Sequence, residues 1–201
     1  WSIRPQTLAF PLFGLVLLSI TKWQKGNNKL LWVLPLATLV WTNLHASFII
    51  VFLLAIPAIF FGSGNKKYLL IATVVAFVAT FVNYYGIDLW RQMFSMVSNQ
   101  SINQYSIEWQ PPVNVGWQKN TYFATLLIIP LLTALIKPRI QLLNWIWFIG
   151  FGWMSLTAIR YDFWFMAVEV IILALLLSPV LDPIFSRGSF FQNRAINTTL
   201  G

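Results

Sequence analysis

Long runs without charged residues constrain the fold of this chain more than any other feature. Apart from Glu169, no Asp, Glu, Lys or Arg occurs in six intervals: 7–21, 30–65, 68–87, 120–136, 140–159 and 163–181. An apolar helix needs roughly 17–25 residues to cross about 30 Å of hydrocarbon, and most of these intervals are near that length. The runs therefore predict an all-α, polytopic integral membrane protein built as a bundle of helices.

The overall composition excludes an ordinary water-soluble domain. Hydrophobic residues make up 58% of the chain and charged residues 9%, whereas soluble domains carry roughly 25% charged residues. The net charge of +8 comes from basic residues scattered in short loops beside the apolar runs. That pattern is typical of the positive-inside rule and of contact with anionic lipid. We expect membrane lipid as a partner and no nucleic acid.

One apolar interval is too long for a single crossing. Residues 30–62 as one helix would be about 50 Å long, and the polar residues 41–45 interrupt the interval. Splitting it there places loops 22–29, 66–67 and 137–139 and the C-terminal tail, with nine Lys and Arg residues, on one side. That side is predicted to be cytoplasmic. Four basic residues remain for the outer side: Arg4, Arg91, Lys119 and Arg160.

With this split the sequence predicts about seven membrane segments in a single transmembrane domain, 1–201. The segments are 6–21, 30–42, 46–62, 68–85, 121–136, 141–158 and 163–181. Residues 86–97 have apolar residues on roughly one helical face, which predicts an amphipathic helix on the outer interface. Residues 98–120 form a long polar loop, so 86–120 is expected to be an outer helix and loop.

His45 and Asn43 lie at the outer end of a predicted span. In one interpretation His45 caps a helix turn. In the other it is a hydrogen-bonding or acid–base group at a substrate pocket, because histidine titrates near neutrality. No metal site and no cofactor are predicted, because this is the only histidine, no carboxylate is adjacent to it, and the chain has no cysteine.

Asn83-Tyr84-Tyr85-Gly86 closes another predicted span, and Gly86 is expected to supply a left-handed turn that ends the helix. Asp88 and Arg91 follow at a spacing of three, which allows an ion pair on a helix. Both also count as candidate substrate-binding residues.

Glu108 is the one acidic residue of the long outer loop, and Trp109 follows it. An aromatic ring can cover the apolar face of a sugar while a carboxylate accepts hydrogen bonds from its hydroxyl groups. The alternative is a loop anchored on the bilayer by Trp109. Pro111 and Pro112 would hold the next residues extended.

Arg160 and Asp162 lie just outside the last predicted span. An outer-face arginine can bind a lipid-linked phosphate through paired hydrogen bonds, or it can pair with Glu108 or Asp162 and hold helices in register. Glu169 lies inside the span, where carboxylates are functional candidates. No second ionisable residue lies mid-span elsewhere, so helix packing through a protonated Glu169 is favoured over a proton relay.

Taken together, four of these polar stretches resemble a group of bacterial polytopic membrane proteins that is similar to the GT-C superfamily of membrane glycosyltransferases. The stretches are 41–47, 83–86, 107–112 and 158–161, and the resemblance covers about 30–181. The family pattern often has Asn-Pro-Tyr-Gly where this chain has Asn83-Tyr84-Tyr85-Gly86. The resemblance implies transfer of a sugar from a polyprenyl-phosphate donor at the outer face of a bacterial inner membrane.

GT-C enzymes carry an acidic catalytic motif in their first outer loop, and no such Asp motif is present in this chain. The resemblance therefore implies that the chain is the C-terminal portion of a longer enzyme. Glu108 and His45 are the candidate catalytic residues here, and Asn43, Asp88, Arg91, Trp109, Arg160 and Asp162 are the candidate substrate-binding residues. The alternatives are a transporter or flippase without covalent chemistry, and a subunit of an envelope complex.

Overall fold

The computed structural model describes residues 5–98 and 105–187, and every regular element in these ranges is helical. This confirms the all-α class. The described residues form two compact units. Unit 1 holds the residues up to Val113 together with Gln141–Val168, and unit 2 holds Asn114–Ile140 together with the residues from Glu169 onward.

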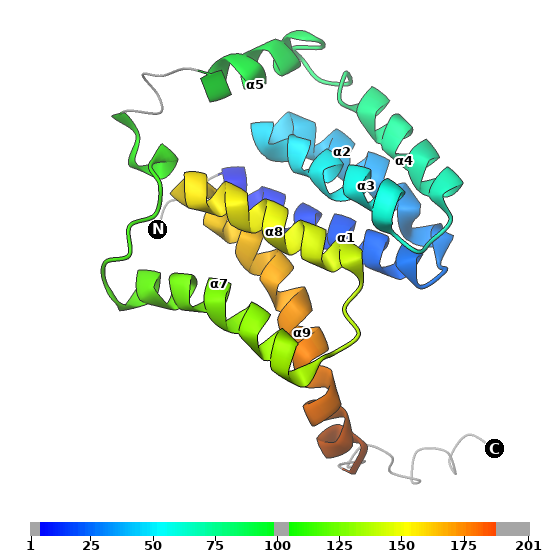
Figure 1. Cartoon of the computed structure of the whole chain (residues 1–201). Helices are drawn as coiled ribbons and strands as arrows, with labels where there is room; N and C mark the ends of the chain where they lie inside the picture. The colour runs from blue at the N-terminus through cyan, green and yellow to red at the C-terminus, as the bar shows by residue number, and fades with distance from the viewer. Residues whose placement is uncertain (1–4, 99–104, 188–201) are drawn as a thin grey trace, which may run out of the picture. The chain divides into compact units, whose positions relative to one another are not determined.

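Figure 1 shows the α-helices of the two units, most of which lie on the expected apolar segments. Unit 1 contains α1 (Pro5–Gln24), α2 (Val33–Leu44), α3 (Ile50–Phe61), α4 (Lys66–Ala79), α5 (Asp88–Ser98), α8 (Leu142–Thr157) and the start of α9 (Asp162–Arg187). Unit 2 contains α7 (Trp117–Ile136) and the rest of α9. Short 3-10 helices in unit 1 are η1 (Asn28–Trp32), η2 (Ala46–Ile49), η3 (Ile107–Trp109) and η4 (Ile159–Tyr161).

The predicted break in the longest apolar interval is confirmed. α2 ends at Leu44, His45 is extended with φ −161°, and η2 begins at Ala46. The chain reverses there, so the loops on either side of the α2–α3 pair come together. The Trp23 indole N–H donates to the Asn65 carbonyl at 2.9 Å, and the Ser63 hydroxyl donates to the Gln24 carbonyl at 3.0 Å. Loops 22–29 and 66–67 thus lie at the same end of unit 1, as the charge pattern predicts.

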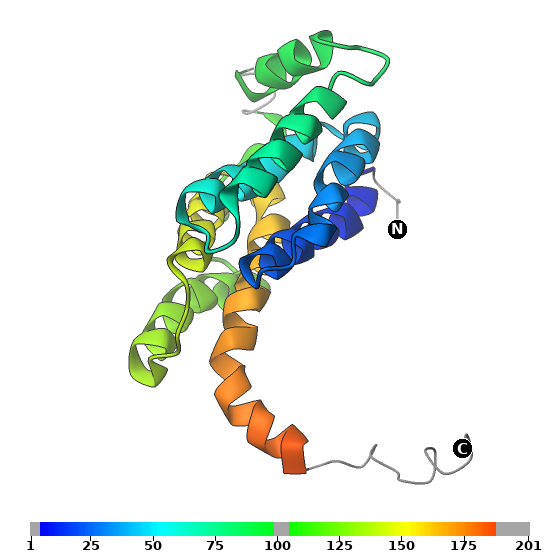
Figure 2. The same cartoon turned by 90° about the vertical axis from the view of Figure 1, so that its right-hand side faces the viewer.

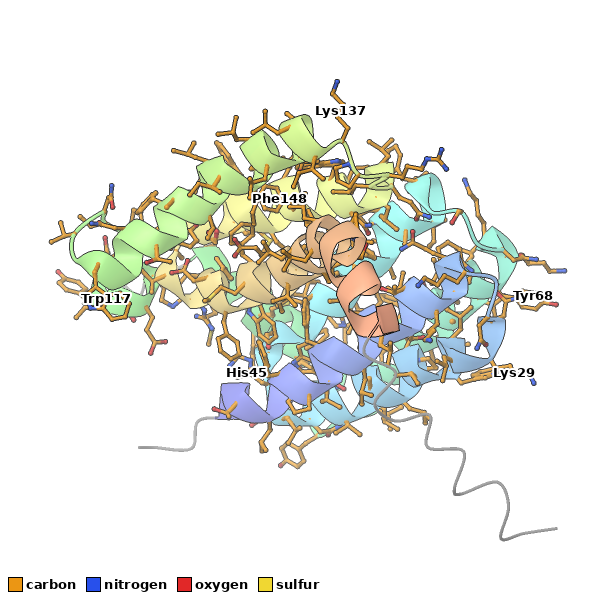
Figure 3. The ribbon with its side chains drawn as sticks, turned by 90° about the horizontal axis from the view of Figure 1, so that it is seen from below. Lys29, His45, Tyr68, Trp117, Lys137 and Phe148 are labelled. Carbon is orange, nitrogen blue, oxygen red and sulfur yellow. The ribbon has the colours of Figure 1, made fainter. Side chains whose placement is uncertain are left out.

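Figure 3 shows the separation of the two ends of unit 1: Lys29 and Tyr68 lie at one end and His45 at the other. The lysine-bearing end is closed by Trp23, which is fully buried. A Cβ atom at Gly62 or Gly64 would run into the Trp23 ring. Glycine is required at both positions because the loop backbone packs directly on the indole.

An aromatic cluster joins the start of α9 to the other helices of unit 1. The Trp164 ring lies 5.2 Å from Phe13 and 5.7 Å from Trp41, and Phe13 lies 6.1 Å from Phe151, measured between ring centroids. These four side chains are almost completely buried. The cluster fixes the end of α8 and the start of α9 beside α1 and α2.

The predicted span 68–85 is too long at its C-terminal end, because α4 stops at Ala79. The Thr80 hydroxyl donates to the Phe77 carbonyl at 2.7 Å and the Asn83 amide donates to the Thr80 carbonyl at 2.6 Å. Such local side-chain bonds compete with the helical ladder and favour turns. Gly86 does adopt a left-handed φ of 52°, but it precedes α5 and does not end α4.

The amphipathic helix expected at 86–97 is α5, Asp88–Ser98. Its Trp90 ring contacts Phe48 at 5.2 Å and Phe77 at 5.6 Å, and its indole N–H donates to the Thr80 hydroxyl at 2.9 Å. α5 is thereby held over the start of α3 and the end of α4 (Figure 2, top).

Among the described residues, two helical stretches are long and apolar enough to cross a membrane, Thr7–Gln24 and Ile159–Pro179. Three further apolar helices are shorter, Ala46–Phe61, Asn120–Ile136 and Leu142–Thr157.

Candidate functional site

Three short helices that are far apart in the sequence, η2, η3 and η4, meet at the His45 end of unit 1. With α5 and α8 they enclose a cavity of about 230 Å³. Most of its lining is apolar, and we call it the apolar cavity. It is lined by Ala46, Ile49, Ile50, Met93, Phe94, Met96, Met154 and Trp164, together with Ser47, Trp109, Arg160 and Tyr161.

Arg160 and Trp109 form the polar edge of this cavity. The guanidinium carbon of Arg160 lies 4.2 Å from the centroid of the Trp109 ring, a cation–π distance. The Ile159 N–H donates to the Gln110 carbonyl at 3.0 Å, which ties η4 to the loop that carries Trp109. Tyr161 meets Trp109 edge to face at 6.2 Å. Among the side chains that the structure describes, no carboxylate forms an ion pair with Arg160.

His45 caps η2, as one of the two interpretations predicted. Its Nδ1 accepts a hydrogen bond from the Ser47 backbone N–H at 3.1 Å and lies 2.7 Å from the Ser47 hydroxyl. That hydroxyl accepts from the indole N–H of buried Trp41 at 3.0 Å. A backbone N–H can only donate, so Nδ1 carries no proton and the neutral ring holds its proton on Nε2.

Burial lowers the pKa of His45 below its ordinary value of 6.5, and the positive charge of Arg160 lowers the pKa further. The imidazole is therefore neutral at pH 7 and offers a ligand a hydrogen-bond donor. This geometry disfavours His45 as a general base, because its one unprotonated nitrogen is already engaged.

A second cavity, of about 240 Å³, lies beside His45. We call it the polar cavity; its lining residues are Thr42, Asn43, Leu44, His45, Ala46, Asn83, Tyr84, Tyr85 and Leu89. Asn43 links α2 to the turn that follows α4, since its side-chain amide donates to the Leu39 carbonyl at 2.8 Å and to the Val82 carbonyl at 3.0 Å. Ala46 lines both cavities.

The other candidate residues lie outside both linings. Asp88 and Arg91 form the predicted ion pair, with 2.7 Å between oxygen and nitrogen, and both side chains are exposed. Glu108 is half-buried in η3 next to Trp109, and Asp162 is half-buried at the start of α9. Neither is among the residues that line the two cavities.

Glu169 lies in unit 2 and is 6% exposed. Its side chain is hydrogen-bonded to Thr125 of α7, while its Oε1 atom has no hydrogen-bond partner among the described residues. The bond between α9 and α7 agrees with a packing role. In the described part of the chain no group of three His, Cys, Asp or Glu residues could hold a metal ion.

Ser47 and the Trp41 indole N–H are the functional groups that sequence reasoning missed. The sequence did contain a signal for Ser47, because it lies two residues after His45 at the start of a helix. At that spacing the serine hydroxyl and backbone N–H can both hydrogen-bond to the histidine side chain. Comparison of the chain with protein-family models, with curated proteins and with solved structures gives no match.

Proposed function

We propose that this chain is an integral membrane protein of about seven membrane segments that binds a polyprenyl-phosphate sugar at the apolar cavity and serves sugar transfer at the outer face. The observation that carries the proposal is Arg160, held on Trp109 in the lining of a mostly apolar cavity. An amphiphile with an anionic phosphate and a hydrocarbon chain has both of the properties that this lining would recognise.

The exposed surface of α4 supports a lipid environment. Its side chains Leu70, Ile71, Val74, Val75, Phe77 and Val78 are each between 38% and 58% exposed. Soluble monomers rarely expose contiguous apolar patches larger than a few hundred Å², whereas lipid covers such a face at no cost. With the long apolar helices α1 and α9, this favours a membrane bundle whose lysine-bearing end faces the cytoplasm.

Arg160 is suited to a phosphate because its partner occupies only the face of the guanidinium. The N–H groups of a guanidinium lie in its plane, so a ring stacked on its face does not block paired hydrogen bonds to phosphate oxygens. The Trp109 ring restricts the rotation of Arg160, so less conformational entropy is lost when the ligand binds. The apolar lining then covers the first isoprene units.

In the transfer step the acceptor hydroxyl gives its proton to a carboxylate, and its oxygen forms a bond to the sugar C1 atom. The bond from C1 to the lipid phosphate oxygen breaks as this bond forms, and the phosphate leaves with the electron pair. Arg160 would stabilise the charge that develops on the leaving phosphate. The candidate proton acceptor in this chain is Glu108, which neighbours Trp109 in η3 and lines neither cavity, and not His45.

Donor recognition can be tested with farnesyl phosphate as a short-chain probe and farnesol as its uncharged control. In lipid nanodiscs, ³¹P NMR should show saturable binding of farnesyl phosphate. Arg160→Gln should weaken this binding about 10- to 100-fold, the range for hydrogen bonds to a charged group. Arg139→Gln is the matched control, because Arg139 is an exposed arginine of unit 2. Equal binding to the wild type and to Arg160→Gln would contradict phosphate recognition at this site.

Transfer itself is tested by release of lipid phosphate from a polyprenyl-phosphate sugar in native membranes. Glu108→Gln should retain farnesyl phosphate binding and lose release. Normal release by Glu108→Gln would remove this carboxylate from the chemistry.

A further inference from the structure

The hydrogen-bonding groups of the polar cavity have directions that the protein itself fixes. Both amide hydrogens of Asn43 are used, one toward the Leu39 carbonyl at 2.8 Å and one toward the Val82 carbonyl at 3.0 Å. Carbonyl oxygens accept and never donate, so the amide orientation is determined. The Asn43 side chain is exposed, and its Oδ1 atom remains as an acceptor for a ligand.

His45 supplies a hydrogen-bond donor in the same cavity. Its Nδ1 atom is engaged by the Ser47 N–H and hydroxyl, and the Ser47 hydroxyl is in turn held by the Trp41 indole N–H. The ring can therefore interact with a ligand only through its Nε2–H group, which donates. The polar cavity thus combines one fixed acceptor, on Asn43, and one fixed donor, on His45 two residues later.

The rest of the lining points to an uncharged ligand with apolar faces. None of the described residues that line the polar cavity is Asp, Glu, Lys or Arg. Tyr84 is 95% exposed and meets Tyr85 edge to face at 5.3 Å. A tyrosine ring provides a flat apolar surface with a polar hydroxyl at its end, which is suited to the C–H face of a sugar.

We propose that the polar cavity is a saccharide-binding site. One sugar hydroxyl accepts from His45 Nε2–H, a second donates to Asn43 Oδ1, and Tyr84 covers the apolar face of the sugar. The assignment to a saccharide rests on the proposed function, because Ala46 lines both cavities and a lipid-linked sugar would place its two chemical parts in adjoining spaces.

The single histidine of the chain makes the test direct. Protein labelled with ¹⁵N-histidine, in nanodiscs free of sugar-based detergent, is titrated with methyl glycosides of glucose, galactose and mannose and with N-acetylglucosamine. At least one probe should shift the Nε2 signal saturably, with a Kd of about 1–10 mM. No saturable shift with any of these probes up to about 100 mM overturns the saccharide site.

Single substitutions in the polar cavity test whether the sugar binds there. Tyr84→Ala and Asn43→Ala should each weaken the binding about tenfold, because hydroxyl groups and the sugar face lose their partners. Tyr68→Ala is the matched control, since Tyr68 is 52% exposed at the opposite end of unit 1 (Figure 3). Tyr84 is so exposed that its replacement does not threaten folding. Equal affinity in Tyr84→Ala, Asn43→Ala and the wild type overturns this location.

Arg160→Gln separates the two proposals. It should weaken farnesyl phosphate binding about 10- to 100-fold and leave the sugar-induced shift unchanged. A sugar-induced shift in a wild-type protein that does not bind farnesyl phosphate supports the saccharide site and refutes the lipid-phosphate function. Farnesyl phosphate binding without any sugar-induced shift supports the lipid-phosphate function and refutes the saccharide site.

Discussion

The guanidinium carbon of Arg160 lies 4.2 Å from the centroid of the Trp109 ring, although the two residues are about fifty positions apart in the chain. The loop carrying Trp109 reaches Arg160 because the Gln110 carbonyl accepts the Ile159 N–H. An arginine packed on an indole places a positive charge in the lining of a mostly apolar cavity. The proposed phosphate binding rests on this contact, and the charge of Arg160 is the smaller of the two causes that lower the pKa of His45.

Replacing Trp109 should therefore weaken binding of an anionic ligand even though Trp109 itself carries no charge. A cation–π contact contributes about 0.5–2 kcal/mol, so Trp109→Ala should raise the Kd for farnesyl phosphate about 2- to 30-fold. Trp109→Phe should have a smaller effect because it keeps an aromatic face. Trp117→Ala is the control, because Trp117 is 77% exposed in unit 2. Equal Kd values for Trp109→Ala and Trp117→Ala would show that the ring does not position Arg160.

His45 should titrate below 6.5, first because of its burial and second because of the charge on Arg160. Between the lowered pKa and 6.5 the unfolded chain binds a proton that the folded chain does not, so the free energy of unfolding rises with pH in this window. The stabilising contribution is complete above pH 6.5 and is lost as the pH falls through the folded-state pKa. ¹⁵N NMR of the single histidine measures the titration directly.

Arg160→Gln removes the smaller of the two causes, so the pKa of His45 should rise toward 6.5 without reaching it. Arg139→Gln should leave the titration unchanged. A wild-type pKa at or above 6.5 would mean that His45 is solvated and that its hydrogen bond to Ser47 is not formed.

Most of the helices were predictable from the sequence because the long charge-free runs have about the length of single helices. The break at His45 was also predictable, since 33 residues exceed one crossing and a polar stretch interrupted them. The end of α4 was not, because Thr80 and Asn83 end the helix through bonds to nearby carbonyls. Apolar residues continue after Ala79, so the hydropathy pattern does not show where α4 ends.

The candidate site was predictable only in part, since Ser47 was missed and the predicted residues Asp88, Arg91, Glu108 and Asp162 lie outside both cavity linings. His45, Trp109 and Arg160 were each identified as polar groups in an apolar chain, whereas the direction of the His45 ring depends on Ser47 and Trp41. Periodicity does not report which nitrogen of an imidazole carries the proton. Only the backbone N–H of Ser47 at 3.1 Å from Nδ1 determines it.

Ser47 should consequently act together with Trp41. Trp41→Phe keeps an aromatic ring beside Trp164, at 5.7 Å in the native protein, but removes the N–H donor to Ser47. We expect a loss of about 1 kcal/mol in the free energy of unfolding. Ser47→Ala should cost at least as much, because it also removes the 2.7 Å contact between the Ser47 hydroxyl and His45 Nδ1. The double variant should cost less than the sum because both changes remove the same Trp41–Ser47 hydrogen bond. Ser47→Thr keeps the hydroxyl group and should give the native ¹⁵N shifts of His45. Additive costs of the two single changes would mean that no hydrogen bond joins Trp41 and Ser47.

Two glycines provide a matched test of how unit 1 is closed at its lysine-bearing end. A Cβ atom at Gly64 would meet the Trp23 ring and the Trp23 carbonyl oxygen, each at 2.5 Å, and Trp23 is fully buried with its indole N–H bonded to Asn65. The ring cannot move without breaking that bond, so Gly64→Ala should lower the free energy of unfolding by about 1–3 kcal/mol. Gly14 lies within α1 and has no atom within 4 Å of its added Cβ. Gly14→Ala should instead stabilise the protein by about 0.5–1 kcal/mol, because alanine favours helix over glycine. Unfolding of both variants in the same lipid–detergent mixture measures the difference, and a Gly64→Ala protein as stable as Gly14→Ala would show that loop 62–65 does not pack on Trp23.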